Sequence, residues 1–121
     1  MNSILKNNFS KLTELRIACI FDEFTYHSFA PECSFLQLKS DSWRDQVEEF
    51  MPDIVFIESA WQGVNDSWYK KVSEVSEELF GLIEWSTSAR IPTAFWCKED
   101  PAHFARFLPV ARLVDYVFTT D

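Results

Sequence analysis

The sequence is poor in glycine, with Gly63 and Gly81 the two examples in 121 residues. The dinucleotide fingerprint GxGxxG and the P-loop GxxxxGK[ST] both need glycines at a short, fixed spacing, and these two lie too far apart to form either. We therefore expect no cofactor within this chain. A nucleotide phosphate would have to be held by other residues or by another domain.

Positive charge and long apolar runs are also scarce. Eleven basic residues stand against 19 acidic ones, giving a net charge of −8, whereas nucleic acids and anionic membrane surfaces attract clustered Lys and Arg. The longest apolar runs, around Val55–Ile57 and Leu113–Phe118, fall far short of the roughly 20 residues that span a bilayer. The mostly polar opening, Met1–Asn8, does not resemble a secretion signal. We expect no nucleic acid partner, no membrane span and a cytoplasmic location.

Short apolar runs alternate with helical patterns along most of the chain. The runs are rich in β-branched and aromatic residues, and this alternation is typical of a parallel sheet with helical crossovers. It predicts an α/β fold, a Rossmann-like open parallel sheet of about five strands flanked by helices, over residues 15–121, with 1–14 a loosely structured lead-in. The predicted strands are Arg16–Phe21, Ser34–Leu38, Asp53–Ile57, Thr93–Trp96 and Tyr116–Thr119, and the predicted helices run through Trp43–Phe50, Trp68–Ala89 and His103–Val110.

Polar residues follow several of these predicted strands. Ligands of open parallel sheets bind outside the carboxyl ends of the strands, so these positions are the candidate site. They are Asp22 and Glu23, Glu58 to Gln62, Lys98 to Asp100, and Thr119 to Asp121.

Two simpler chemistries could also use residues at these positions. Asp22, Glu23 and Glu58 could hold Mg²⁺ through oxygen ligands, although solvated carboxylates and helix caps are the commoner role for such residues. Cys97 follows a strand and precedes Lys98, which would favour a thiolate nucleophile, but no histidine adjoins it. The three cysteines show no CxxC spacing, so reduced thiols are expected.

Two tryptophans stand at or just beyond strand ends, beside polar residues. Indole rings stack on the apolar faces of sugars, so Trp61 and Trp96 could form a carbohydrate platform. Interior packing is the stronger alternative for Trp96. For Trp61 the two interpretations are balanced.

Several segments together resemble one family. They are PDIVFIESAW (Pro52–Trp61), IPTAFWCKEDPAHFARF (Ile91–Phe107) and DYVFTTD (Asp115–Asp121). They are similar to the N-terminal region of the bacterial glycosyltransferase-like proteins named after spore maturation protein CgeB. The resemblance covers Arg16 to Asp121, and the block IPTxFWxKEDPxHFxxF is long and unusual in composition.

The resemblance implies one half of a GT-B glycosyltransferase, in which two Rossmann-like halves face each other across a cleft. The C-terminal half binds the nucleotide-sugar donor, and the N-terminal half presents a glycan or other acceptor. This chain would be the acceptor-side half, inactive alone, with a missing C-terminal donor-binding domain as its partner. Because the sequence stops directly after a strand, we expect the natural chain to continue.

The matching polar residues supply the candidate site. A transferase needs a group that accepts or orients the proton of the acceptor hydroxyl, and carboxylates or histidine can do this. Asp100 could equally cap the following helix. The predicted catalytic residues are Glu58, Glu99, Asp100 and His103, the predicted substrate-binding residues are Asp22, Glu23, Ser59, Trp61 and Lys98, and no metal ligand is assigned.

Two alternatives lack this chemistry. A receiver domain has a similar length and an acidic pair after its first strand, but here Glu58 stands where a receiver has its phosphorylated Asp, and no Lys follows the last strand. A stand-alone interaction or carbohydrate-binding module is the other alternative. An uncovered sheet edge would then favour a homodimer.

Overall fold

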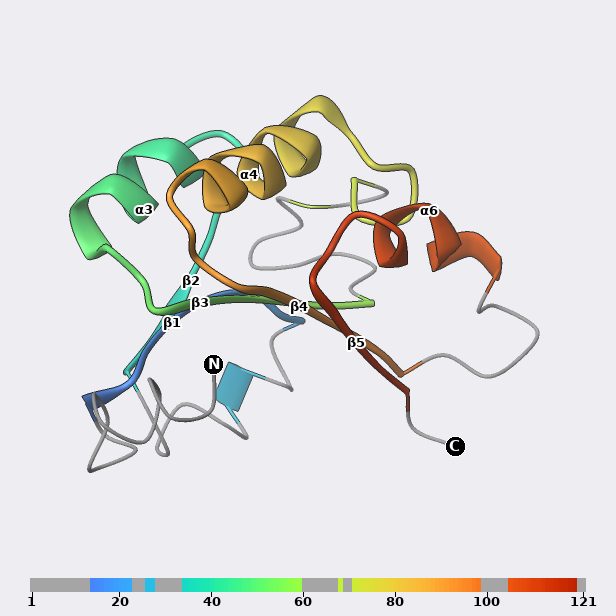
Figure 1. The fold of residues 1–121 in the computed structure, drawn as a ribbon, viewed down its shortest axis with the longest axis horizontal. Helices are drawn as coiled ribbons and strands as arrows, with labels where there is room; N and C mark the ends of the chain where they lie inside the picture. The colour runs from blue at the N-terminus through green and yellow to red at the C-terminus, as the bar shows by residue number, and fades with distance from the viewer. Residues whose placement is uncertain are drawn as a thin grey trace.

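The computed structural model describes residues 14–22, 26–27, 34–59, 68, 71–98 and 105–119. Five strands form one all-parallel sheet in the order β2-β1-β3-β4-β5 (Figure 1). The predicted α/β, Rossmann-like class is confirmed, and each strand lies within one residue of its predicted bounds. The strands are β1 (Arg16–Ile20), β2 (Ser34–Gln37), β3 (Ile54–Glu58), β4 (Thr93–Cys97) and β5 (Tyr116–Thr119).

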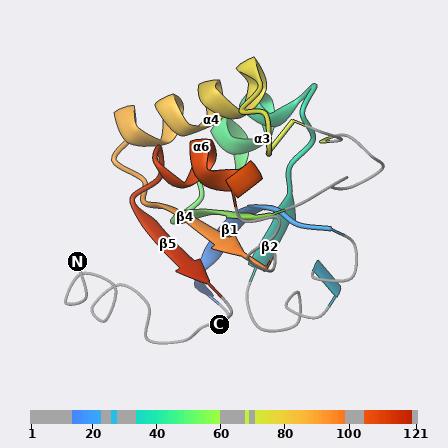
Figure 2. The same ribbon diagram turned by 90° about the vertical axis from the view of Figure 1, so that its right-hand side faces the viewer.

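The central strands are apolar on both faces because the sheet separates two cores. Three helices, α3 (Trp43–Phe50), α4 (Glu77–Ser88) and α6 (Leu108–Ala111), lie on one side of the sheet (Figures 1 and 2). Beneath them the main core includes Ile20, Ile57 and Phe95. A smaller cluster of Ile17, Cys19 and Phe21, with Phe35 and Phe56 packed against it, lies on the other face.

Helix α4 begins later than predicted. The periodicity suggested a helix from Trp68, but Trp68 and residues 71–75 form turns, and the helix begins at Glu77. The backbone of Val75 is left-handed, with φ of 47°, which a continuous helix does not allow. Ser76 then caps the helix, its side chain accepting a hydrogen bond from the Leu79 amide at 3.2 Å.

Gly81 lies inside α4 because two helices approach closely there. A Cβ atom at this position would lie 3.1 Å from Cζ2 of Trp43 on α3, which is tighter than ordinary contact. The missing side chain therefore lets the Trp43 ring pack directly against the α4 backbone.

The other two predicted helices are largely confirmed. Helix α3 has the predicted bounds. Met51 forms its C-cap with a left-handed φ of 51°, and Pro52 follows directly. Within the predicted helix His103–Val110, the described part begins with a 3₁₀ turn, Ala105–Phe107, which continues directly into α6. No helix in the described ranges has the length and apolar character needed to cross a membrane.

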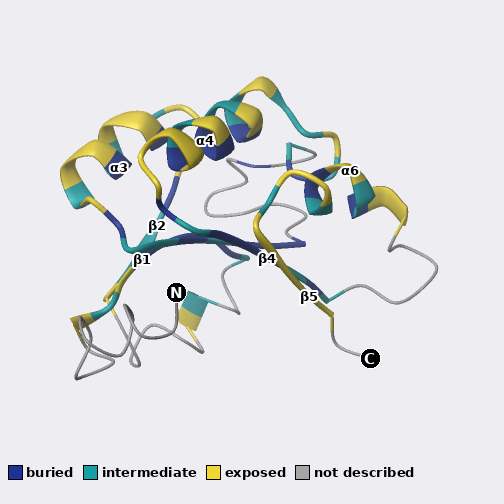
Figure 3. Ribbon diagram, viewed as in Figure 1, coloured by how far each residue is buried: buried dark blue, intermediate teal, exposed yellow. Residues whose placement is uncertain are grey.

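Strand β5 differs from the other strands in its exposure. All four of its residues are exposed, whereas β1 and β4 are mostly buried (Figure 3). It pairs with β4 in parallel, and Tyr116 lies beside Ala94 and Phe118 beside Trp96 on the neighbouring strand. Tyr116 is 43% exposed and Phe118 53% exposed, so among the described residues this edge of the sheet presents apolar side chains to solvent.

Candidate functional site

The strand order reverses between β1 and β3. The chain passes from β1 outward to β2, returns to β3, and continues outward on the other side to β4 and β5. Such a switch point is where ligands bind in open α/β sheets. The chain segments that follow the two adjacent strands leave in opposite directions there, which leaves room outside the carboxyl ends of the strands. Asp22 follows β1, and Glu58 ends β3, so the structure places both at this point.

Glu58 is the centre of the site. Its side chain is completely buried, and its Oε1 accepts a hydrogen bond from the backbone N–H of Asp22. Its Oε2 lies 2.9 Å from Nζ of Lys98. A buried carboxylate is tolerated when such partners offset its lost hydration, so the two contacts stabilise the Glu58 carboxyl group inside the fold.

Lys98 is held at both its backbone and its side chain. Its N–H donates to Oγ of Ser59 at 2.9 Å, and the Ser59 N–H donates to the Trp96 carbonyl at 2.9 Å. These bonds join the residues that follow β3 and β4. The Lys98 side chain is 32% exposed, so its ammonium lies between the buried carboxylate and water.

Gln37, at the end of β2, is part of the site, although no sequence pattern predicted a functional role for it. Its Oε1 accepts from the Phe21 N–H at 3.1 Å, and its Nε2 donates to the Phe21 carbonyl at 3.0 Å. A glutamine within the apolar run SFLQL was the available clue, because a polar side chain that packs against neighbouring strands needs a partner there. Strand β2 itself is an edge strand whose residues are exposed or half-buried.

The Cys19 thiol lies beside these groups and is inert. Its Sγ is 3.6 Å from Oε1 of Gln37 and 3.5 Å from the Leu36 carbonyl. Burial, with a smaller contribution from the Glu58 charge, raises the pKa of Cys19 far above that of an ordinary thiol. It is therefore protonated at neutral pH and is no nucleophile.

The structure brings together the predicted residues that it describes. Asp22, Glu58, Ser59 and Lys98 meet at the carboxyl edge of β1, β3 and β4. Across the described ranges, no group of three or more His, Cys, Asp or Glu side chains is arranged to hold a metal ion. Five predicted residues lie outside the described part of the chain: Glu23, Trp61, Glu99, Asp100 and His103.

Two further residues singled out in the sequence, Cys97 and Trp96, are described, whereas residues 60–62 and 120–121 lie outside the described part. Cys97 is 1% exposed and packs in the core beneath the helices, where a reactive thiol would be out of reach of solvent. Trp96 is half-buried and lies in register with Glu58 and Phe118.

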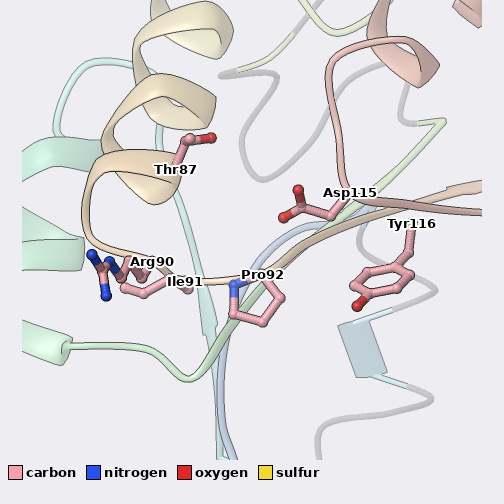
Figure 4. A pocket seen from close by; sticks show the side chains of 6 residues that line it. All are labelled: Thr87, Arg90, Ile91, Pro92, Asp115 and Tyr116. Atoms are coloured by element: carbon pink, nitrogen blue, oxygen red, sulfur yellow. The ribbon is translucent and has the colours of Figure 1, made fainter. Parts of the chain in front are cut away.

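A hollow lies at the opposite end of the sheet from these residues. It measures about 460 Å³ and is bounded by Asp115 and Tyr116 on one side and by Thr87 and Arg90 on the other (Figure 4). Asp115 is already engaged, since its Oδ2 accepts from the Thr93 N–H at 3.0 Å. The hollow is at the amino ends of β4 and β5, away from the edge where parallel sheets bind ligands, so we assign it no function.

No protein-family model, curated protein or solved structure matches this chain. The chemistry of the site is therefore argued from its own residues.

Proposed function

We propose that the chain is the acceptor-side half of a GT-B glycosyltransferase, with the CgeB-like resemblance of its sequence as the starting point. The observation that carries the proposal is the Asp22–Glu58–Lys98 cluster at the switch point of a parallel sheet. Charged groups gather where ligands of this fold bind, while the sequence contains no glycine-rich phosphate loop. This combination suits a half that presents an acceptor and leaves the nucleotide to another domain.

The described contacts suggest how the roles divide. Both oxygens of Glu58 already accept from donors inside the protein, which makes it better suited to positioning Lys98 than to removing a proton. The partly exposed Lys98 ammonium would then contact an acidic group of the acceptor or, in the assembled two-domain enzyme, a donor phosphate that the other half holds. In this proposal the general base comes from Glu99, Asp100 or His103, and Asp22, Glu23 and Trp61 contact the acceptor. Ser59, predicted from the sequence to bind substrate, is fully buried and instead holds the Lys98 backbone.

A titration followed by amide NMR tests this assignment. Oligosaccharide acceptors are expected to shift the amide signals of Asp22, Ser59 and Lys98, while UDP-sugars alone leave them in place. We also expect no sugar transfer by the 121-residue chain alone. UDP-sugar binding at this edge, or transfer by the isolated chain, would refute the acceptor-side assignment.

A second candidate function is an interaction module without catalysis, favoured by the exposed edge of β5. Val117 is 43% exposed, as is Tyr116, and Phe118 is 53% exposed. Strand β5 itself carries no charged residue that would discourage pairing. The strand order is also that of receiver domains. In this alternative, a second copy pairs with β5.

Light scattering distinguishes the two candidates. The interaction module predicts about twice the monomer mass of 14.2 kDa, falling to the monomer value in Val117→Lys, which places a charge on the paired edge. Arg44→Glu, on the exposed face of α3, is the matched control and should leave the mass unchanged. A monomer at all concentrations would exclude pairing through β5.

A further inference from the structure

The backbone N–H groups at the end of β1 are occupied from within the chain. In nucleotide-binding α/β folds, N–H groups at the first strand-to-helix turn hold the phosphate. Here the Phe21 N–H donates to Gln37 on β2, and the Asp22 N–H donates to Glu58 on β3. The two strands that flank β1 thus each supply a side chain to the switch point.

The surroundings of the Glu58 carboxylate resemble those of a bound anion. Bound carboxylates and phosphates are typically held by a backbone N–H together with a Lys or Arg cation. Glu58 has this set: the Asp22 N–H on one oxygen and Lys98 Nζ, 2.9 Å away, on the other. Its complete burial keeps competing water away.

We infer that the switch point contains an anion-binding site whose ligand is the chain's own Glu58 carboxylate. While that side chain is in place, the N–H groups at the carboxyl ends of β1 and β3 take no nucleotide phosphate. When it is shortened, the site takes a small external carboxylate. The inference goes beyond the glycosyltransferase proposal and does not depend on it, because it concerns the donor groups of this sheet alone.

The size of the side chain identifies the probe. Glu58→Ala removes one methylene and the carboxylate, which together have the size and charge of acetate. It leaves the half-buried Asp22 N–H and the partly exposed Lys98 ammonium facing the gap, and losing the Glu58 acceptor is costly for both donors. Acetate can restore both interactions, whereas chloride supplies charge without the paired oxygens.

Thermal unfolding of Glu58→Ala in sodium acetate and in sodium chloride of equal ionic strength tests the inference. Ligand that binds the folded state alone raises the melting temperature, and at tenfold its Kd the expected rise over chloride is about 5 °C. The wild-type protein should show no such difference, because its site is filled. UDP and inorganic phosphate should leave the wild-type melting temperature unchanged.

Two further variants separate this site from a general salt effect. Glu58→Ala combined with Lys98→Met should lose the response to acetate, because the cation is gone. Gln37→Ala is the control, because it opens a gap beside the Phe21 N–H without removing an ion-pair partner of Lys98. Its melting temperature should be the same in acetate and in chloride. An equal response of all variants, or acetate stabilisation of the wild type, would overturn the inference.

Refolding covers the case in which Glu58→Ala does not fold in chloride. The variant is diluted from urea into acetate or chloride, and the recovered native fraction is measured by near-ultraviolet circular dichroism. Recovery in acetate with none in chloride supports the site. Failure in both salts, with Glu58→Gln folding normally in both, would show that Glu58 acts through its shape and neutral hydrogen bonds, and the inference would be wrong.

Discussion

Lys98→Met is expected to lower the free energy of unfolding by about 3–5 kcal/mol. The reason is the carboxylate that remains. Glu58 is completely buried, and without the ammonium at 2.9 Å its charge loses a close counter-ion in a medium that hydrates it poorly. Methionine preserves most of the apolar length of the lysine side chain, so the loss reports the charge.

The Lys71–Glu78 pair provides the matched control. These side chains are 36% and 32% exposed, so water screens the pair, even though the hydrogen bond from Lys71 lowers the pKa of Glu78. Lys71→Met should therefore cost about 0–1 kcal/mol. Both variants are compared by urea denaturation with the wild type. A loss for Lys98→Met no greater than for Lys71→Met would mean that Glu58 is not buried as an ion.

A second large effect is expected for Trp68→Ala, about 3–5 kcal/mol of lost stability. Trp68 is 0% exposed and is the largest fully buried side chain among the described residues. Its ring fills the core beneath the helices, and its Nε1 donates to the Leu38 carbonyl, just after β2, at 2.8 Å. Truncation removes apolar contacts and leaves that buried carbonyl without its donor.

Trp68→Phe separates the two contributions. Phenylalanine keeps an aromatic ring but cannot donate to Leu38, so this variant should lose about 1–3 kcal/mol, less than the alanine variant. Urea unfolding followed by far-ultraviolet circular dichroism measures all three proteins. Equal losses in the two variants would show that the hydrogen bond dominates, whereas a negligible loss in Trp68→Ala would contradict its assignment to the core.

The periodicity of the sequence predicted the sheet well and the second helix less well. Apolar runs such as Asp53–Ile57 identify buried strands because both faces of a parallel strand are covered, and β3 lies where this run predicted. The start of α4 was misplaced because Trp68, Val72 and Leu79 are buried at near-helical spacing without sharing one helix. Turns packed on a core can imitate a helical pattern.

The sequence by itself determined the α/β class, the positions of the strands, the absence of a phosphate-binding loop and the gathering of polar residues at strand ends. Its local pattern is sufficient for these features because they depend on neighbouring residues. Only the tertiary structure decided that Glu58 is buried between the Asp22 N–H and Lys98, and that Gln37 closes the end of β1. Those contacts join residues 16 to 40 positions apart, and strand order and register, which bring them together, depend on the packing of the whole sheet.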